Sequence, residues 1–242
     1  MQSSSENTEH SANHSRTLVV MAKAPRPGMV KTRLAQSLPV EAVTELYRCL
    51  LGDTVQLARS LSSVEVAVMC PVSDVGELAC LAGDAVQIVA QTGEGLAAGL
   101  TSVFAHFASG QRCVIAFNSD SPHLPASVLE NAFQALAAHD VVIGPTHDGG
   151  YYLVGAKASH PKLFEGDGMG TESALDALLA HTRAMQLSVG FTDSFYDIDV
   201  AGDLTRLAAE LQLAPSRAPR TAAWLKRWER AVAQLPTGTG NL

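Results

Sequence analysis

Short apolar runs alternate along the chain with longer Ala- and Leu-rich segments of helical character. The runs with β-strand composition lie at residues 17–22, 64–70, 85–90, 112–117 and 140–145. The segments between them that have the length of crossover helices are 40–61, 73–82, 94–108 and 125–138. Because the strand-like runs are apolar throughout instead of alternating, we expect both of their faces to be covered. This rhythm predicts an α/β protein with a mostly parallel sheet.

The pattern is less regular in the second half of the chain. Residues 149–156 form a β-type run after a Gly-Gly pair, and residues 170–181 predict a helix with Thr171 or Ser173 near its cap. A further short strand is expected at 185–190, and a helix beginning near Ala201 follows an acidic loop. This change of rhythm fits a sheet whose first half binds a nucleotide and whose second half, connected differently, receives an acceptor.

The ends of the chain differ from its middle. Residues 1–16 are polar and lack an apolar core, which predicts a disordered leader and not a signal peptide. Residues 17–213 show neither an internal repeat nor a Gly/Ser linker, so we expect one domain there, followed by a C-terminal helix and tail at 214–242. No apolar run approaches the roughly 18–20 residues that a membrane span requires, so we expect a cytoplasmic protein without a membrane partner.

Composition narrows the function classes. The 242 residues carry a formal net charge of −7, which argues against a general nucleic-acid binder because such proteins neutralise phosphates with surplus Lys and Arg. The four cysteines show no metal-ligand spacing, so we expect reduced thiols, without a zinc site or a disulfide scaffold. Any anion must therefore be bound by a local group of basic residues.

Such a group follows the first apolar run, in the segment MAKAPRPGMVKTRL at residues 21–34. Lys23, Arg26, Lys31 and Arg33 lie there among prolines and a glycine, and no Asp or Glu occurs between His10 and Val40. A basic loop at the carboxyl end of a strand, close to a helix start expected beside residues 31–33, suits the phosphates of a polyanion. The Gly-Lys pair of a Walker A loop is absent, which disfavours a P-loop NTPase.

Carboxylates follow other apolar runs. Asp120 lies in NSDSPHLP at residues 118–125, where a divalent cation could be held against phosphates, although an Asp in a loop can also cap a turn. Asp148 precedes Gly149 and Gly150, a sequence that also suits an ordinary hairpin turn. We expect His123 and His147, which lie beside these residues, to be surface side chains, although His123 could also be a metal ligand and His147 could accept a proton.

A third acidic group lies in DIDVAGDL at residues 197–204. Three neighbouring carboxylates repel each other unless a cation or a basic group shares the space. We expect Asp203 to interact with the N-terminus of the following helix, which leaves Asp197 or Asp199 to complete a metal or Lys/Arg site. The glycine-rich segment 91–100, which includes Gly93, could admit a base or ribose, but such turns into helices are common.

Together the segments AKAPRPGMVKTRLA, NSDSPHLP, GPTHDGGYYLVGA and DIDVAGDL, in this order, resemble a bacterial family of small GT-A-type transferases. Its members are described as glycosyltransferases or nucleotide-diphospho-sugar transferases, and it is distantly related to 2-phospho-lactate guanylyltransferase and molybdenum-cofactor nucleotidyltransferases. The resemblance spans roughly residues 17–213. It implies a GT-A fold, in which a mostly parallel, doubly wound mixed sheet lies in three α/β/α layers. The chain departs from the family pattern at His123, at Met169 and in the glycine-rich segment, which lacks an Arg.

The resemblance also implies roles for individual residues. Asp120 and Asp199 would bind Mg²⁺ or Mn²⁺, Asp148 and Lys31 would act in catalysis, and the acceptor substrate would meet Gly149, Gly150 and Tyr151. The implied nucleotide-binding residues are Ala22, Lys23, Ala24, Arg26, Gly28, Lys31, Thr32, Arg33 and Gly93.

Three functions compete. The first is metal-dependent glycosyl transfer from a nucleotide-diphosphate sugar to a small acceptor. The second is nucleotidyl transfer from an NTP to a phosphorylated small molecule, with release of pyrophosphate. Both reactions must neutralise a departing phosphate chain, so the family resemblance, and not the residues, favours glycosyl transfer. The third is a catalytically silent nucleotide-binding protein.

Overall fold

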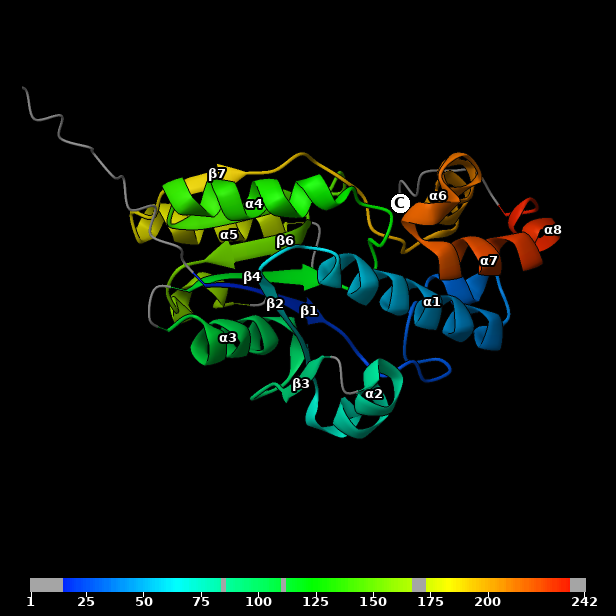
Figure 1. Cartoon of the computed structure of the whole chain (residues 1–242), viewed down its shortest axis with the longest axis horizontal. Coiled ribbons are helices and arrows are strands. Elements are labelled where there is room, and N and C mark those ends of the chain that lie inside the picture. Colours follow the sequence, from blue (N-terminus) through cyan, green and yellow to red (C-terminus); the bar gives the residue numbers. More distant parts are fainter. Residues whose placement is uncertain (1–14, 84–85, 110–111, 167–172, 236–242) are drawn as a thin grey trace, which may run out of the picture.

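The computed structural model describes residues 15–83, 86–109, 112–166 and 173–235. Its strands are β1 Arg16–Met21, β2 Val64–Cys70, β3 Gln87–Ala90, β4 Cys113–Asn118, β5 Val141–Pro145, β6 Tyr151–Ala156 and β7 Val189–Phe191. They form one seven-stranded sheet with the order β3-β2-β1-β4-β6-β5-β7 (Figure 1). The apolar runs predicted as strands all coincide or overlap with one of these strands, including the two runs in the less regular second half.

The direction of the strands decides which loops meet. Neighbouring strands are parallel except at β6, which runs antiparallel to β4 and β5. The sheet grows from β1 toward β2 on one side and toward β4 on the other, and the crevice outside the carboxyl ends at such a switch point is where open sheets bind ligands. Because β6 is reversed, its first residue, Tyr151, lies at that edge. The pairing of Leu153 with Phe117 near the end of β4 fixes this position.

Helices cover both faces of the sheet. They are α1 Val40–Arg59, α2 Val75–Ala82, α3 Gly95–Phe107, α4 Ala126–Ala138, α5 Ala174–Ala184, α6 Ala201–Leu213, α7 Pro219–Arg227 and α8 Glu229–Val232. Helices α1, α2 and α4 pack on one face, and α3 and α5 pack on the other. The predicted three-layer α/β/α arrangement is therefore confirmed.

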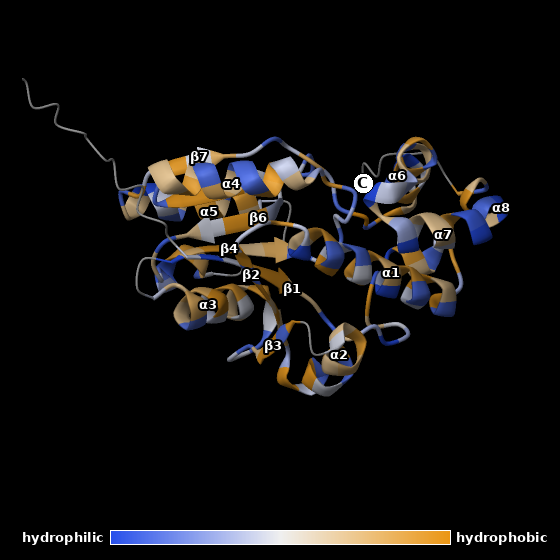
Figure 2. Ribbon diagram, viewed as in Figure 1, coloured by the Kyte–Doolittle hydropathy of each residue, from blue (hydrophilic) through white to orange (hydrophobic). Residues whose placement is uncertain are grey.

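The strand sequences explain these two cores. Leu18 and Val19 are neighbours in β1, and both have no exposed surface, yet they belong to cores on opposite faces of the sheet. Figure 2 shows the strands as predominantly apolar, whereas the helices carry polar residues among apolar ones. The uninterrupted apolar runs thus result from strands that are buried on both sides.

A third apolar cluster lies on the outer side of α1. Leu46 and Leu50 of α1 pack there with Leu207 of α6 and Trp224 of α7, and all four are almost fully buried. Figure 1 shows α6, α7 and α8 grouped at the end of α1 that lies away from the sheet. The C-terminal helices are thus packed against the helix that also covers the sheet.

The local predictions have mixed outcomes. Helix α6 begins at Ala201 as predicted, and Oδ2 of Asp203 accepts the backbone N–H groups of Asp199 and Val200 at its N-terminus. The helix start predicted beside residues 31–33 is wrong, because a 3-10 turn at Leu34–Gln36 follows and α1 begins only at Val40. Ser173 lies at the N-cap of α5.

Some predictions fall on residues that the structure does not describe. These are the leader up to residue 14, Met169, Thr171 and the tail from residue 236 onward. Within the described ranges, no helix combines the length and the apolar character needed to cross a membrane.

Candidate active site

A cleft of about 1160 Å³ opens at the carboxyl edge of the sheet. The loops after β1, β2 and β3, the end of β4 and the beginning of β6 contribute to its walls, and so do Asp197 and Asp199. The loops that follow strands therefore converge as expected. Volumes of this order hold whole small-molecule ligands.

The loop at residues 22–33, here called the β1 loop, is anchored by acidic residues from distant parts of the chain. Oδ2 of Asp74 accepts the Ala24 N–H at 2.8 Å, and Oδ1 accepts from Nη1 of Arg26 at 2.8 Å. Arg26 also pairs with Glu77 at 2.7 Å. Burial tends to raise the pKa of Asp74, but these donors outweigh it, so the pKa lies below its ordinary value. The absence of acidic residues near the loop in sequence therefore does not leave its charges unpaired.

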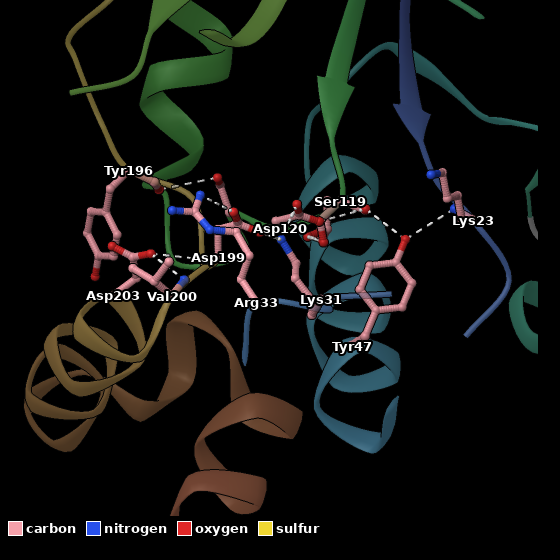
Figure 3. A network of polar contacts seen from close by, with 12 residues as sticks. Lys23, Lys31, Arg33, Tyr47, Ser119, Asp120, Tyr196, Asp199, Val200 and Asp203 are labelled. Atoms are coloured by element: carbon pink, nitrogen blue, oxygen red, sulfur yellow. Dashed lines mark hydrogen bonds and ion pairs between the residues drawn. The ribbon is translucent and has the colours of Figure 1, made fainter. Parts of the chain in front are cut away.

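Lys31 lies at the centre of the site (Figure 3). Its backbone has a φ of 49°, which is uncommon for a residue with a side chain, and its side chain is only 6% exposed. Nζ lies 2.5 Å from Oδ2 of Asp120 and 3.6 Å from Oδ1 of Asp199. Burial alone would lower the pKa of Lys31, but the charges of these two carboxylates raise it above its ordinary value. The structure therefore contains a buried ammonium between the two residues predicted to bind a metal.

Asp120 is oriented by a chain of hydrogen bonds from the other side. The Lys23 N–H donates to the Tyr47 hydroxyl at 3.1 Å, that hydroxyl lies 3.0 Å from Oγ of Ser119, and Ser119 donates to Oδ1 of Asp120 at 2.8 Å (Figure 3). Since Tyr47 accepts from Lys23, its own proton is directed at Ser119. Burial and the charge of Asp120 raise the pKa of Tyr47 to about 12, which keeps the hydroxyl protonated.

The acidic loop before α6 completes the site. Arg33 pairs with Oδ2 of Asp199 at 2.9 Å, so Asp199 contacts both basic residues at the end of the β1 loop. Asp197 also lines the cleft, and burial together with the charges of Asp120 and Asp148 raises its pKa to about 6, despite the opposing effect of Lys31. The expectation that a basic group shares the space of these carboxylates is confirmed.

The side chains of the site do not by themselves form a complete set of metal ligands in the described residues. Across the described ranges, no group of three His, Cys, Asp or Glu side chains could hold a metal ion. Asp120 and Asp199 instead face one point, which the Lys31 ammonium takes. Magnesium commonly uses only one or two carboxylates and completes its shell with phosphate oxygens and water, so this donor set fits a metal that arrives with a phosphate ligand.

The glycine-rich segment forms another wall of the cleft. Nε2 of the buried Gln91 donates to the carbonyl oxygens of Gly93 and Gly95 at 3.0 and 3.2 Å. Both glycines have φ near +80°, a conformation that other residues rarely adopt. The turn thus depends on its glycines, and Gly93 lines the cleft.

Asp148 lies in the hairpin turn between β5 and β6. Its Oδ1 accepts from Oγ1 of Thr146 at 2.5 Å and from the Gly150 N–H at 3.3 Å, and Gly149 has a φ of 90°. The alternative reading of this sequence as a hairpin turn therefore describes the local structure. Asp148 is exposed but close enough for its charge to raise the pKa of Asp197.

The predicted site residues divide into two groups by position. Those that line the cleft are Ala22, Lys23, Lys31, Thr32, Arg33, Gly93, Asp120, Tyr151 and Asp199. Those outside the set of lining residues are Ala24, Arg26 and Gly28 of the β1 loop and Asp148, Gly149 and Gly150 of the hairpin. Ala24 and Arg26 take part in anchoring the loop to Asp74.

His123 was predicted to be a surface residue, and this prediction is wrong. Its side chain is 2% exposed, its ring lies 4.5 Å from that of Tyr196, and neither ring nitrogen has a hydrogen-bond partner among the described residues. Burial lowers the pKa of His123 to about 4, so the ring is neutral at pH 7. His123 is packed against Tyr196, away from the lining of the cleft.

A protein-family model matches the middle of the chain. The profile of a family described as "Uncharacterized protein conserved in bacteria (DUF2064)" matches residues 54–171. This segment of the chain is similar to the DUF2064 family, and it makes up slightly less than half of the sequence. The matched range includes Asp120 and Asp148, whereas the β1 loop and Asp199 lie outside it. No protein of curated function matches the chain in sequence.

Solved structures show which fold this is. A crystal structure from Desulfovibrio desulfuricans G20, described as a "putative nucleotide-diphospho-sugar transferase", is 26% identical with a TM-score of 0.83, over 91% of this chain and 98% of that one. The protein therefore has the nucleotide-diphospho-sugar transferase fold, as the resemblance to GT-A-type transferases implied.

More distant structures share the fold only. A nucleotidyl transferase from Methanothermobacter thermautotrophicus has 18% identity and a TM-score of 0.57, over 82% of this chain and 99% of that one. The structure of 4-diphosphocytidyl-2C-methyl-D-erythritol synthase from Anaerococcus prevotii has 10% identity and a TM-score of 0.53, over 88% of this chain and 97% of that one. Both sequences are too dissimilar to transfer a reaction to this chain.

Several residues of the site were not predicted from the sequence. Asp74 sits in an ordinary helix-start sequence after β2, and Tyr47 lies in the middle of α1 without any motif. Ser119 was visible only as the neighbour of Asp120. The available signal was position, since Ser119 directly follows β4 and Asp74 lies in the segment after β2, and both strands end at the cleft.

Proposed function

We propose that the protein transfers a glycosyl group from a nucleotide-diphosphate sugar to a small acceptor. The observation that carries the proposal is the convergence of the β1 loop, Asp120 and Asp199 at the carboxyl edge of a sheet with the nucleotide-diphospho-sugar transferase fold. The cleft of about 1160 Å³ is large enough for a nucleotide and a sugar together. The structure from Desulfovibrio supports this assignment by similarity over nearly its whole length.

The basic residues would stabilise the departing diphosphate. Lys31 and Arg33 line the cleft, and each is held by a carboxylate at a fixed place. Preorganised charges of this kind stabilise the negative charge that develops on a leaving group. The anchored β1 loop would supply them without rearrangement of the backbone.

Mg²⁺ or Mn²⁺ would be held by Asp120 and Asp199 together with the phosphates. When bound, such a metal neutralises charge on the diphosphate. Lys31 now forms ion pairs with both carboxylates, so we propose that its ammonium turns from them toward the phosphates when substrate binds. The Lys31 ammonium would thus stabilise the carboxylates before substrate binds and the phosphates afterwards.

On the acceptor side, Asp148 would orient or deprotonate the attacking hydroxyl, and Tyr151, Gly149 and Gly150 would lie around the acceptor. Tyr151 supports this placement because it lines the cleft at the start of β6. The hydrogen bonds of Asp148 to Thr146 and Gly150 fix its carboxylate at the tip of the hairpin.

Nucleotidyl transfer is the second candidate. The Methanothermobacter protein, which is named a nucleotidyl transferase, shares the fold over 82% of this chain. A phosphorylated acceptor would then attack the α-phosphate of an NTP, and pyrophosphate would leave. The same basic loop and carboxylates would serve this reaction.

The released product distinguishes the two reactions. The full-length protein is incubated with Mg²⁺ or Mn²⁺, a panel of nucleotide sugars and NTPs, and mixed small acceptors, while nucleoside diphosphate and pyrophosphate are measured separately. Glycosyl transfer predicts a nucleoside diphosphate that appears only with a nucleotide sugar. Release of pyrophosphate from an NTP would refute it in favour of nucleotidyl transfer.

The third possibility, a catalytically silent nucleotide-binding protein, is also an outcome of this experiment. Tight nucleotide binding by calorimetry, without turnover of any donor, would establish it and overturn both transferase proposals. An Arg112→Gln variant is the matched control for the site variants, because Arg112 pairs with Glu65 away from the cleft.

A further inference from the structure

A second cavity, of about 260 Å³, lies between α1, α2 and α7, away from the cleft. Its apolar lining includes Leu51 and Val55 of α1, Val68 of β2 and Leu78 of α2, and polar side chains complete its wall. An apolar cavity of about 150 Å³ is known to take a benzene molecule. This one therefore has room for an aromatic ring with a short chain attached.

Arginines surround the cavity. Arg48 and Arg59 come from α1 and Arg220 from α7, and none of the described residues that line the cavity is acidic. In the described ranges, none of these arginines forms an ion pair with a carboxylate. Nη2 of Arg48 donates a long hydrogen bond of 3.4 Å to the Pro25 carbonyl. A protein with a net charge of −7 thus places three arginines without ion pairs around one apolar hollow.

The guanidinium of Arg220 lies against Gly52, a residue that lowers the stability of its helix. Gly52 lies in the interior of the 20-residue helix α1, where glycine is less favourable than alanine. A Cβ at Gly52 would lie 2.0 Å from Nη1 of Arg220, so only glycine lets the guanidinium rest on the helix. The backbone on either side is fixed, because Asp53 accepts the N–H groups of Arg220 and Thr221. The backbone of Arg220 is therefore fixed beside the cavity, and its exposed side chain lies along α1 at the rim.

We propose that this cavity binds a small organic anion, with an apolar ring or short chain in the hollow and a carboxylate or phosphate at the arginines. The apolar lining accounts for the body of the ligand, and the arginines account for its charge, because the guanidinium fork matches both kinds of anion. The site is separate from the transferase cleft, so it does not depend on the proposed reaction.

The test uses 4-phenylbutyrate and phenyl phosphate as anionic probes and 4-phenylbutanol as the neutral analogue. Binding is followed by calorimetry and located by NMR shifts of backbone amides. We expect at least one anion to bind about tenfold more tightly than the alcohol and to shift amides of α1 and α2 around the cavity. The two anions distinguish a carboxylate ligand from a phosphate ligand.

Two variants and one control make the test specific. Arg220→Gln should weaken binding about tenfold, in keeping with loss of one charge-assisted hydrogen bond. Gly52→Ala should weaken binding similarly by displacing Arg220, while the melting temperature does not fall, because alanine favours the helix. The control is Arg227→Gln, on the same helix but paired with Glu45. Equal binding of the alcohol, shifts confined to the transferase cleft, unchanged binding in both variants, or no binding would each overturn the proposal.

Discussion

Lys31 illustrates how a single buried charge can hold the carboxylates of a site together. Burial normally favours the neutral form of lysine, yet the charges of Asp120 and Asp199 more than offset that effect here. The ammonium is therefore part of the structure of the cleft as well as a proposed contact for a ligand. Without this ammonium, there would be no buried lysine to offset the negative charges of Asp120, Asp197 and Asp199.

The first prediction concerns this ion pair. Lys31→Met and Asp120→Asn should each lower kcat/KM of the transfer by about 100-fold or more, because each removes a preorganised charge from the site. Lys31→Met should also lower the melting temperature, since it leaves the carboxylates without their central cation. Steady-state kinetics and thermal denaturation measure both effects, with Arg112→Gln as control. Full rates in both variants would show that the site is assigned wrongly.

The second prediction concerns His123. Its pKa of about 4 in the folded protein lies below the ordinary 6.5, so the unfolded chain binds more protons between these values. Stability should therefore be fully present above pH 6.5 and fall as the pH drops to about 4, by on the order of 3 kcal/mol. Below that pH the contribution of His123 levels off.

Urea denaturation at pH 4.5 and 7 measures this effect in the wild type and in His123→Phe. Asp197 acts in the opposite direction, because its raised pKa removes stability as the pH rises from 3.8 to about 6. The comparison with the variant cancels that contribution. The phenylalanine protein should lose less stability at pH 4.5 than the wild type, and equal losses in the two proteins would contradict the prediction.

At this scale the sequence identified residue types better than their partners. Lys31 and Asp120 were predicted because charged side chains after strands meet at one edge of a parallel sheet, whereas Asp199 was chosen over Asp197 from the family resemblance. The partners of Arg26 were not predictable, because they are remote in sequence: Asp74 and Glu77 lie 48 and 51 positions after it. His123 was misplaced because a polar residue in a loop is more often exposed than stacked on a buried ring.

At the scale of elements, the β1 loop depends on η2 and α2. Asp74, at the end of the 3-10 turn Val72–Asp74, accepts one backbone N–H of the loop and one guanidinium nitrogen of Arg26. A buried carboxylate with several donors holds a loop more firmly than an exposed ion pair does. The position of the loop is therefore set by an element that contacts the cleft only at its edge.

The third prediction tests this anchoring. Asp74→Ala should weaken nucleotide binding about tenfold and speed amide exchange in residues 22–33, because Ala24 and Arg26 lose their acceptor. Glu77→Ala removes the exposed partner of the same arginine and should have little effect. Calorimetry and hydrogen exchange provide the measurements. The anchoring role fails if the two variants bind nucleotide equally well.

The elements themselves were largely predictable, because long apolar runs and amphipathic segments record burial directly. The irregular parts were less so. The 3-10 turn at Leu34–Gln36 separates the β1 loop from α1, and the predicted C-terminal helix is divided at Trp228 into α7 and α8. The start of α1 at Val40 is marked locally by Pro39 at its N-cap, whereas the break at Trp228 has no glycine or proline and depends on tertiary packing that the local sequence does not specify.

For the molecule as a whole, the C-terminal helices act as part of the core on the outer side of α1. Leu46 and Leu50 face Trp224 there, and each of these side chains is at most 1% exposed. The fourth prediction follows: Trp224→Ala should lower the free energy of unfolding by about 3–5 kcal/mol, and a chain ending at residue 213 should aggregate or lose cooperative unfolding.

Denaturant titration and size-exclusion chromatography test both parts of this prediction. Leu213→Ala is the matched control, because Leu213 lies in the same region but is 91% exposed, and it should change stability by less than about 0.5 kcal/mol. A chain ending at residue 213 that remains monomeric and unfolds cooperatively would show that the domain is complete without α7 and α8.

The long-range contacts of the acidic loop before α6 have a consequence for biosynthesis. The chain emerges from the ribosome with its N-terminus first, and its first strands and the β1 loop are available well before Asp199. Arg33 therefore cannot pair with Asp199 until the chain has grown by 166 residues. Similarly, Asp53 contacts the backbone of Thr221 at the start of α7, 168 positions later. A nascent chain should consequently acquire its sheet before its ligand site, and nucleotide can begin to stabilise the protein only near the end of translation.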